Sequence, residues 1–442
     1  MIVRYSLVLD PAYINKLRTQ YGITERSIAP PATVQMVPPR TLSSQSAEVR
    51  AQAATLVRGN ARRYAELEIS LFVQEAPSYR VQLRFNRPDD KGVHEPISGT
   101  ATFNSQELLA ETIDPVAYGQ LLTRSLFQDQ AVLQEFHDIC TATEANSKDL
   151  RLRLVIDRKA HELHDVRWET LFHPIKMDSP LLTDEHILFS RFLGTRGFRP
   201  IPPFSHNPQK ALLAIANPTD ITHYRINNQP LAAIKVQDEL DRAASCLGTI
   251  NRDELFSVPA SPGRVTLTHL LEKLHEGYTI LYLICHGAMY TKGKLSPHLL
   301  LEKADGKAEP ILVEELVKQL RGMSQLPQLV VLGSCQSAGN GMYSPGEKKM
   351  LATLGPKLAA AGIPAVVGMQ GEISMDTLTR FMPTFFVEWQ KDGQLDRAMA
   401  VARRTVIEQQ DWWMPVLFTR LRDGCLWSTA TTDNSHHYSR FA

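Results

Sequence analysis

The chain has 442 residues, of which 43% are hydrophobic and 21% charged, and its formal net charge is +1 at pH 7. This composition is ordinary for a soluble globular protein and leaves room for two or three domains. The charge is nearly balanced and no dense lysine or arginine block occurs, which argues against direct nucleic-acid binding, because phosphate binding needs a concentrated basic surface.

The cysteines are few and widely scattered. Cys140, Cys246, Cys285, Cys335 and Cys425 show neither zinc-ligand spacing nor a disulfide framework. We therefore expect no metal site and a reducing, cytoplasmic compartment. The N-terminus lacks a signal-peptide layout and no apolar run has membrane-spanning length, so we also expect no membrane partner. The composition is compatible with a local pocket that binds a small nucleotide.

Residues 1–59 form an extension of uncertain type. Ile2–Leu9 favours a strand and Pro11–Tyr21 a short helix, before several prolines interrupt regular structure. The composition of Ser43–Glu66 predicts a helix. The extension fits a docking or regulatory arm, a strand with a linker, or a partly disordered segment, and the sequence does not choose among them.

Residues 60–205 are expected to form an α+β, non-catalytic half. Strands are predicted at Glu68–Val73, Tyr79–Phe85 and Thr100–Phe103, and helical spacing runs from Leu121 to Cys140. Further on, we expect a half-buried strand at Leu152–Ile156, a short amphipathic turn at Trp168–Phe172, a strand at Ile187–Phe192 and a proline-rich linker at Arg199–Pro203.

Residues 206–428 alternate between strand and helix patterns, which predicts an α/β domain. Strands are expected at Ala211–Ala216, Leu255–Val258, Ile280–Cys285, Leu329–Ser334, Ile363–Gly368 and Pro415–Leu421, with a hairpin-like insertion around His298–Leu301. Helices are expected at Leu231–Leu247, Thr266–His275, Leu312–Leu320, Leu351–Ala361, Met375–Lys391 and Leu395–Glu408. Residues 429–442 form a polar tail that we expect to be disordered.

Two of these strands end at reactive side chains. The apolar run Ile280–Cys285 leads into His286 and Gly287, and the run Leu329–Ser334 leads into Cys335. Short apolar runs bounded by turn residues are typical of buried parallel strands, and ligands bind at the carboxyl ends of such strands. The sequence therefore predicts that His286 and Cys335 face one crevice.

A thiol becomes a strong nucleophile when a neighbouring imidazole takes its proton, and the imidazole then protonates the leaving amine. The backbone N–H groups of Gly287 and Cys335 would stabilise the oxyanion. The alternative is structural, because free cysteines are often buried and a histidine at a strand end is often only a hydrogen-bonded polar group. Cys285 should point to the opposite face from His286, into the core.

Together the two runs resemble the CHAT-domain branch of the caspase-like cysteine peptidases. Cys335 follows His286 by 49 residues, close to the spacing of roughly fifty seen in caspases. The segments 214–218, 358–368 and 393–402 and the Arg167-Trp168-Glu169 core of 152–172 also resemble CHAT domains. The likeness covers about residues 68–428.

The resemblance implies a caspase-like, mostly parallel sheet flanked by helices on both faces and preceded by a non-catalytic half. It implies that His286 is the general base and acid, that Cys335 is the nucleophile, and that Gly287 and Cys335 supply the oxyanion hole. The implied reaction is hydrolysis of peptide bonds in a protein substrate, with no metal or organic cofactor.

The chain departs from its relatives at Gly333. Caspases carry glutamine two residues before the nucleophile and metacaspase-type enzymes carry aspartate, so neither specificity transfers to this chain. We expect that Gln336, Gln370 and Glu372 line the substrate cleft, although solvated loop residues would give the same pattern.

Bacterial relatives imply an effector that stays latent until a partner protein or a nucleotide second messenger activates it, in bacterial defence or programmed cell death. The alternative function is a catalytically silent caspase-fold scaffold or signal receptor. Substrate, activator and oligomeric state leave no signal in the sequence.

Overall fold

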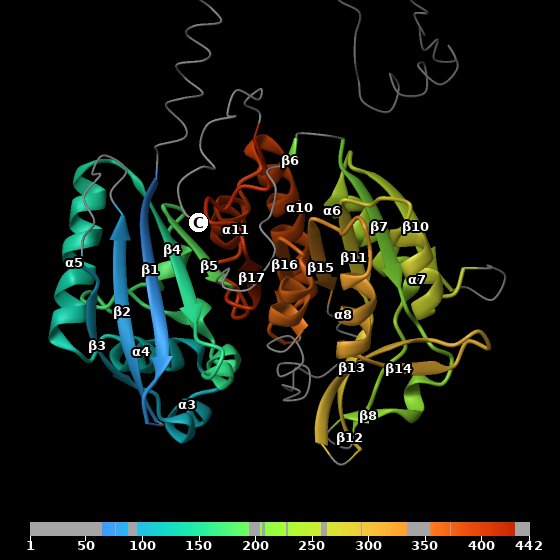
Figure 1. The fold of residues 1–442 in the computed structure, drawn as a ribbon, viewed down its shortest axis with the longest axis horizontal. Helices are drawn as coiled ribbons and strands as arrows, with labels where there is room; N and C mark the ends of the chain where they lie inside the picture. The colour runs from blue at the N-terminus through green and yellow to red at the C-terminus, as the bar shows by residue number, and fades with distance from the viewer. Residues whose placement is uncertain are drawn as a thin grey trace, which may run out of the picture. The chain divides into compact units, whose positions relative to one another are not determined.

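The computed structural model describes residues 64–75, 77–86, 95–193, 204–205, 208–226, 229–257, 263–292, 294–333, 354–371 and 373–428 (Figure 1). All of these residues belong to the unit Val57–Ala442. The elements expected before Tyr64, the linker Arg199–Pro203 and the tail 429–442 lie outside the described residues.

One eleven-stranded sheet runs through the described residues, and its strands can be followed across Figure 1. Its order is β10 (Asn251–Phe256), β7 (Lys210–Ile215), β11 (Ile280–Ile284), β15 (Leu329–Gly333), β16 (Ala365–Met369), β17 (Pro415–Thr419), β5 (Ile187–Phe192), β4 (Asp149–Ile156), β1 (Tyr64–Val73), β2 (Ser78–Asn86) and β3 (Ile97–Thr102).

Most neighbouring strands of this sheet are parallel. The antiparallel pairs are β16 with β17, β1 with β2 and β2 with β3. The expected fold class, an α/β structure built on a mostly parallel sheet, is confirmed. Strands from both expected halves belong to this one sheet, and the division into domains at residues 205 and 206 stays a prediction.

Helices cover both faces of the half that contains β7, β11, β15 and β16. Alternate strand residues pack on one face against helices α6 (Val236–Leu247), α10 (Met375–Asp392) and α11 (Leu395–Arg404). The other alternate residues pack against α7 (Leu267–Leu274), α8 (Val313–Arg321) and the helical stretch 354–361. The continuous apolar runs in the sequence reflect this burial on both faces.

The N-terminal half places helices α3 (Ser105–Ala110), α4 (Pro115–Leu126) and α5 (Gln130–Ala145) against one face of β1 to β4. The helical spacing predicted over 121–140 corresponds to two helices, the end of α4 and the first part of α5, which are separated at residues 127–129. The Asp129 side chain accepts hydrogen bonds from the N–H groups of Ala131 and Val132 and so starts α5. The helix expected over 43–66 is wrong for its last three residues, because Tyr64, Ala65 and Glu66 belong to β1.

The expectation that β4 is half-buried is wrong. Arg151 and Arg153 are each only 3% exposed, because their partners cover them. Arg151 donates to Asp396 of α11 at 2.5 Å, and Arg153 donates to the Arg422 carbonyl and to Glu66. The contacts with Asp396 and Arg422 join β4 to residues 245 and 269 positions further along the chain.

Smaller elements surround the main sheet. The hairpin-like insertion is a three-stranded sheet of β12 (His286–Lys292), β13 (Lys294–Glu302) and β14 (Ala308–Leu312). The remaining strands are short: β6 (Phe204–Ser205), β8 (Arg225–Ile226), β9 (Gln229–Pro230) and β18 (Trp427–Ser428). Four short 3-10 helices are labelled η1 (His161–Asp165), η2 (Trp168–Thr170), η3 (Leu181–Thr183) and η4 (Ile221–His223) among the described residues. Residues 231–235, expected to be helical, precede α6 without regular structure.

Candidate active site

Two adjacent parallel strands bring the candidate site to one edge of the sheet. Strand β11 pairs with β15 in a register that sets Ile284 opposite Gly333, so both strands end at the same level. His286 lies two residues beyond the end of β11, at the start of β12. Cys335, Gln336 and Glu372 lie outside the described residues, and their roles stay predictions.

The imidazole of His286 is oriented by a backbone carbonyl. His286 is 5% exposed, and its Nε2 lies 2.9 Å from the carbonyl oxygen of Ala232. A carbonyl oxygen only accepts, so Nε2 carries the proton that makes this hydrogen bond. In the neutral ring Nδ1 is then the basic nitrogen, which is the arrangement that a general base requires.

Gly287 and Cys285 flank His286 with different environments. Gly287 is buried in β12, opposite Leu299 of β13. Cys285 packs against the core cluster that also contains Leu281 and Leu283. Burial raises the pKa of the Cys285 thiol to about 12. The thiol is therefore protonated at neutral pH, so Cys285 is not suited to act as a nucleophile.

Gly333 has no room for a side chain. A Cβ at this position would lie 2.8 Å from Cγ1 of Ile284 and 3.2 Å from Cε1 of Tyr282, both on the neighbouring strand β11. Caspases and metacaspases place a polar side chain at this point of the motif. Here the side chains of Ile284 and Tyr282 occupy that space.

Gln370 follows β16 and is engaged in a buried polar network. It is 4% exposed; its Oε1 accepts from Arg191 at 2.9 Å, and its Nε2 donates to Glu169 at 2.7 Å. Arg191 and Glu169 form a bidentate pair with distances of 3.0 and 2.5 Å. In this structure the Gln370 amide joins β5 and η2 to the end of β16, and its role in substrate binding stays a prediction.

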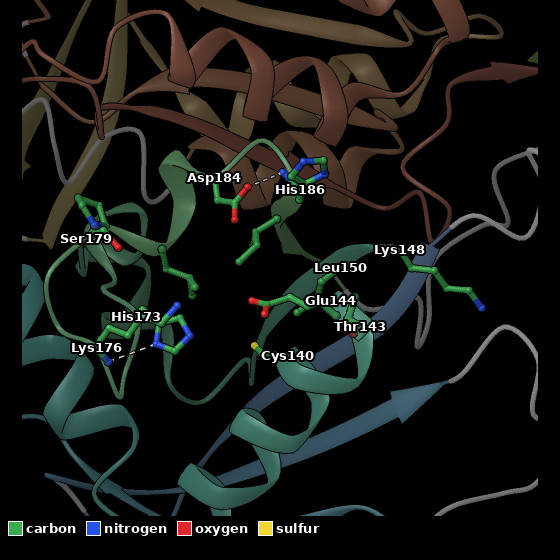
Figure 2. A pocket seen from close by; sticks show the side chains of 13 residues that line it. Cys140, Thr143, Glu144, Lys148, Leu150, His173, Lys176, Ser179, Asp184 and His186 are labelled. Atoms are coloured by element: carbon green, nitrogen blue, oxygen red, sulfur yellow. Dashed lines mark hydrogen bonds between the residues drawn. The ribbon is translucent and has the colours of Figure 1, made fainter. Parts of the chain in front are cut away.

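A separate cavity lies in the N-terminal half (Figure 2). It measures about 140 Å³, and its lining includes Cys140, Glu144, His173, Lys176 and His186. Figure 2 shows Cys140 and Glu144 on α5. Burial raises the pKa of the Cys140 thiol to about 12 and is the main cause that lowers the pKa of His173. Cys140 is therefore protonated at neutral pH and forms no reactive thiolate beside His173. His286 does not line the cavity.

The described residues offer neither a metal site nor a membrane-spanning helix. Among them, no group of three or more histidine, cysteine, aspartate or glutamate side chains is arranged to hold a metal ion. None of their helices combines the length and the apolar character that crossing a membrane would require.

No pattern in the sequence identifies the Ala232 carbonyl as the partner of His286. Every residue carries a carbonyl group, so only the fold reveals which one meets the imidazole. The hydrogen bonds of Arg191 and Glu169 with Gln370 are likewise invisible in local patterns, because Gln370 lies 179 and 201 positions away in the sequence.

Comparison with known families decides the relationship. The CHAT domain matches residues 116–439, which is most of the chain. This chain belongs to the CHAT-domain family. A search of curated proteins found no match.

Solved structures similar to this CHAT-domain chain include a Saccharomyces cerevisiae separase–securin complex. It has 10% identity and a TM-score of 0.44, over 85% of this chain and 31% of the separase chain. This chain thus spans less than a third of that chain. The Arg-specific cysteine proteinase gingipain R is 12% identical, with a TM-score of 0.39, over 68% of each chain. A Porphyromonas gingivalis RgpB complex of pro- and mature domains is 11% identical, with a TM-score of 0.37, over 67% of this chain and 70% of that one.

Proposed function

We propose that this CHAT-domain chain is a cysteine endopeptidase that hydrolyses peptide bonds of a protein substrate through His286 and Cys335. The observation that carries the proposal is the His286 imidazole. It lies two residues beyond the end of β11, which pairs with the parallel strand that leads to Cys335, and its Nε2–H donates to the Ala232 carbonyl. The basic nitrogen Nδ1 is thereby defined.

The proposed reaction begins when Nδ1 of His286 takes the proton of the Cys335 thiol. The thiolate attacks the carbonyl carbon of the scissile peptide bond, and the backbone N–H groups of Gly287 and Cys335 bind the oxyanion. The C–N bond then breaks while the imidazolium gives its proton to the leaving amine. Water, deprotonated by His286, hydrolyses the thioester, which releases the acid product and restores the thiol.

The Ala232 carbonyl supports both halves of this cycle. A hydrogen bond from Nε2–H keeps the neutral ring in one tautomer, and it also stabilises the positive charge that appears when Nδ1 is protonated. Its acceptor is a backbone atom, so no side-chain carboxylate is needed to orient the ring.

Gln336, Gln370 and Glu372 remain the proposed substrate-binding residues, and activation of a latent enzyme by a partner protein or nucleotide remains a prediction from the resemblance. The same holds for a role in bacterial defence, whereas the cytoplasmic location remains a prediction from the cysteine content and the N-terminal sequence.

The proposal is tested by incubating the chain with a proteome-derived peptide library and mapping new N-termini by mass spectrometry. We expect cleavages by the wild type that disappear in Cys335→Ala and in His286→Ala. Cys285→Ala is the matched control, because it removes a neighbouring thiol, and it should retain cleavage. Cleavage that persists in Cys335→Ala would refute the assignment. If, with every candidate activator supplied, neither wild type nor variant cuts, the silent scaffold is favoured instead.

A further inference from the structure

The carbonyl that binds His286 belongs to a segment without regular structure, so something else must hold it in place. Ala232 lies in residues 231–235, between β9 and α6. The N–H of Leu231 donates to the Tyr224 carbonyl at 2.8 Å. The N–H of Ile234 donates to Oδ1 of Asn217 at 2.9 Å. The side chains of Leu231 and Ile234 are buried on either side of Ala232. One anchor of this segment is therefore a side chain.

Asn217 is held in turn by a buried carboxylate. Its backbone N–H donates to Oε1 of Glu302 at 3.0 Å, while the N–H of Val265 donates to Oε2 at 2.8 Å. Glu302 is 1% exposed. Burial raises the pKa of this carboxyl, and the two backbone hydrogen bonds act in the opposite direction. A carboxyl group buried this deeply is costly unless its oxygens accept hydrogen bonds, and both oxygens of Glu302 do so.

Glu302 also leads back to the histidine. It is the last residue of β13, and in that strand Leu300 pairs with His286 of β12. The contacts thus form a closed circuit: from the His286 ring to Ala232, then to Ile234, Asn217 and Glu302, and along β13 to the backbone of His286. The circuit links the His286 ring to its own backbone.

We infer that Asn217 and Glu302 are positioning residues, which hold the Ala232 carbonyl in place and thereby keep His286 in its Nε2–H tautomer. This inference rests on the dyad proposed above, since it assigns the tautomer that makes Nδ1 the base. In the contacts of the described residues, Asn217 and Glu302 bond to backbone amides and not to the His286 ring. Asn217 acts through the Ile234 amide, and Glu302 acts through the position of Asn217.

The direct test is the tautomer of His286, read by long-range ¹H–¹⁵N NMR on protein labelled with ¹⁵N-histidine and assigned with His286→Gln. Asn217→Leu keeps the size of the side chain and removes the acceptor. We expect the ratio of Nε2–H to Nδ1–H tautomer to fall about tenfold, the effect of roughly one hydrogen bond. Asn217→Asp keeps an acceptor oxygen and should retain the wild-type ratio.

Asp220→Leu is the matched control. Asp220 lies in the same loop and its Oδ1 accepts from the Ala308 N–H at 2.7 Å, so its loss weakens the loop without touching residues 231–235. The tautomer ratio should remain that of the wild type. Glu302→Gln tests the same link from the far side: it places an –NH₂ group against one of the two backbone N–H groups, and it should lower the ratio.

A second readout separates this inference from the proposed function. The rate at which iodoacetamide labels Cys335 should fall in Asn217→Leu toward that of His286→Ala and stay unchanged in Asp220→Leu. If labelling of the wild type is insensitive to His286→Ala, the dyad is refuted, yet the tautomer ratio still tests the positioning. A wild-type ratio in Asn217→Leu, or an equal shift in Asp220→Leu, would overturn the inference.

Discussion

The buried pair of Arg191 and Glu169 should be among the most sensitive positions of the fold. Arg191 donates to both carboxylate oxygens of Glu169, to Gln370 and to the carbonyls of His164 and Val166. Arg191 lies on β5, Glu169 on η2 and Gln370 just after β16. The Arg191 guanidinium therefore joins the N-terminal half to the edge of the sheet at which the candidate site is proposed.

The expected magnitude follows from burial. The side chains of Arg191 and Glu169 are 2% and 1% exposed, so Arg191→Met leaves a carboxylate that water cannot reach. Removing one partner of a buried ion pair costs about 3–5 kcal/mol of unfolding free energy. Replacing both partners, as in Arg191→Met with Glu169→Leu, removes the stranded charge. The double variant should therefore lose about 2 kcal/mol less than the sum of the single variants.

Arg153→Met is the matched control in the neighbouring strand. Arg153 is as deeply buried, but its partner Glu66 is 30% exposed and becomes hydrated when the arginine is lost. We expect a cost of about 1–2 kcal/mol, mainly from packing and one lost backbone hydrogen bond. Urea unfolding followed by circular dichroism compares the wild type with the two single variants, the double variant and Arg153→Met. Equal costs for Arg191→Met and Arg153→Met would refute the reasoning.

Three further predictions concern single positions. Gly333→Ala should cost about 1–3 kcal/mol in urea unfolding, because its Cβ would lie 2.8 Å from Ile284; an unchanged midpoint would contradict the close contact. Burial raises the pKa of Cys285 to about 12, so iodoacetamide should label Cys285 slowly in the folded chain and readily in urea, as peptide mapping would show; fast labelling when folded would be against it. Burial, with help from Arg191, lowers the pKa of His164 to about 3, below the ordinary value of about 6.5 in the unfolded chain. The unfolded chain therefore binds this proton first, so the stability is complete above pH 6.5 and is lost as the pH falls toward 3. Between pH 7 and pH 5 the wild type should lose about 2 kcal/mol more than His164→Leu, and parallel pH profiles of the two would contradict this.

The sequence predicted well those parts of the fold whose burial shows in local patterns. The strands of β7, β11, β15 and β16 have helices on both faces, so their apolar runs are unbroken and easy to recognise. In β4 the alternation of arginine and aliphatic residues predicts a strand with one face exposed to solvent, whereas both faces are buried. The partners that bury Arg151 and Arg153 include Asp396 and the Arg422 carbonyl, and no local pattern reveals contacts of that range.

In the candidate site, too, local sequence patterns indicate some features and only the fold reveals the others. His286 was found because a reactive side chain ended an apolar run, which is a local signal. Its hydrogen-bond acceptor is the carbonyl of Ala232, a group that all residues share, and its supports Asn217 and Glu302 come from two other segments. Only the packing of these segments around β13 brings them together. Asn217 was visible as part of the CHAT pattern, but the pattern did not state its contact.

The central claim is that His286 activates Cys335, and the most direct measurement is the rate of Cys335 alkylation as a function of pH. Iodoacetamide labelling, quantified by intact mass and peptide mapping, would compare the wild type with His286→Ala. An assembled dyad predicts fast labelling of the wild type at neutral pH and a slower rate in the variant. Labelling that rises only near the free thiol value of about 8.5, and is the same in both proteins, would contradict the claim.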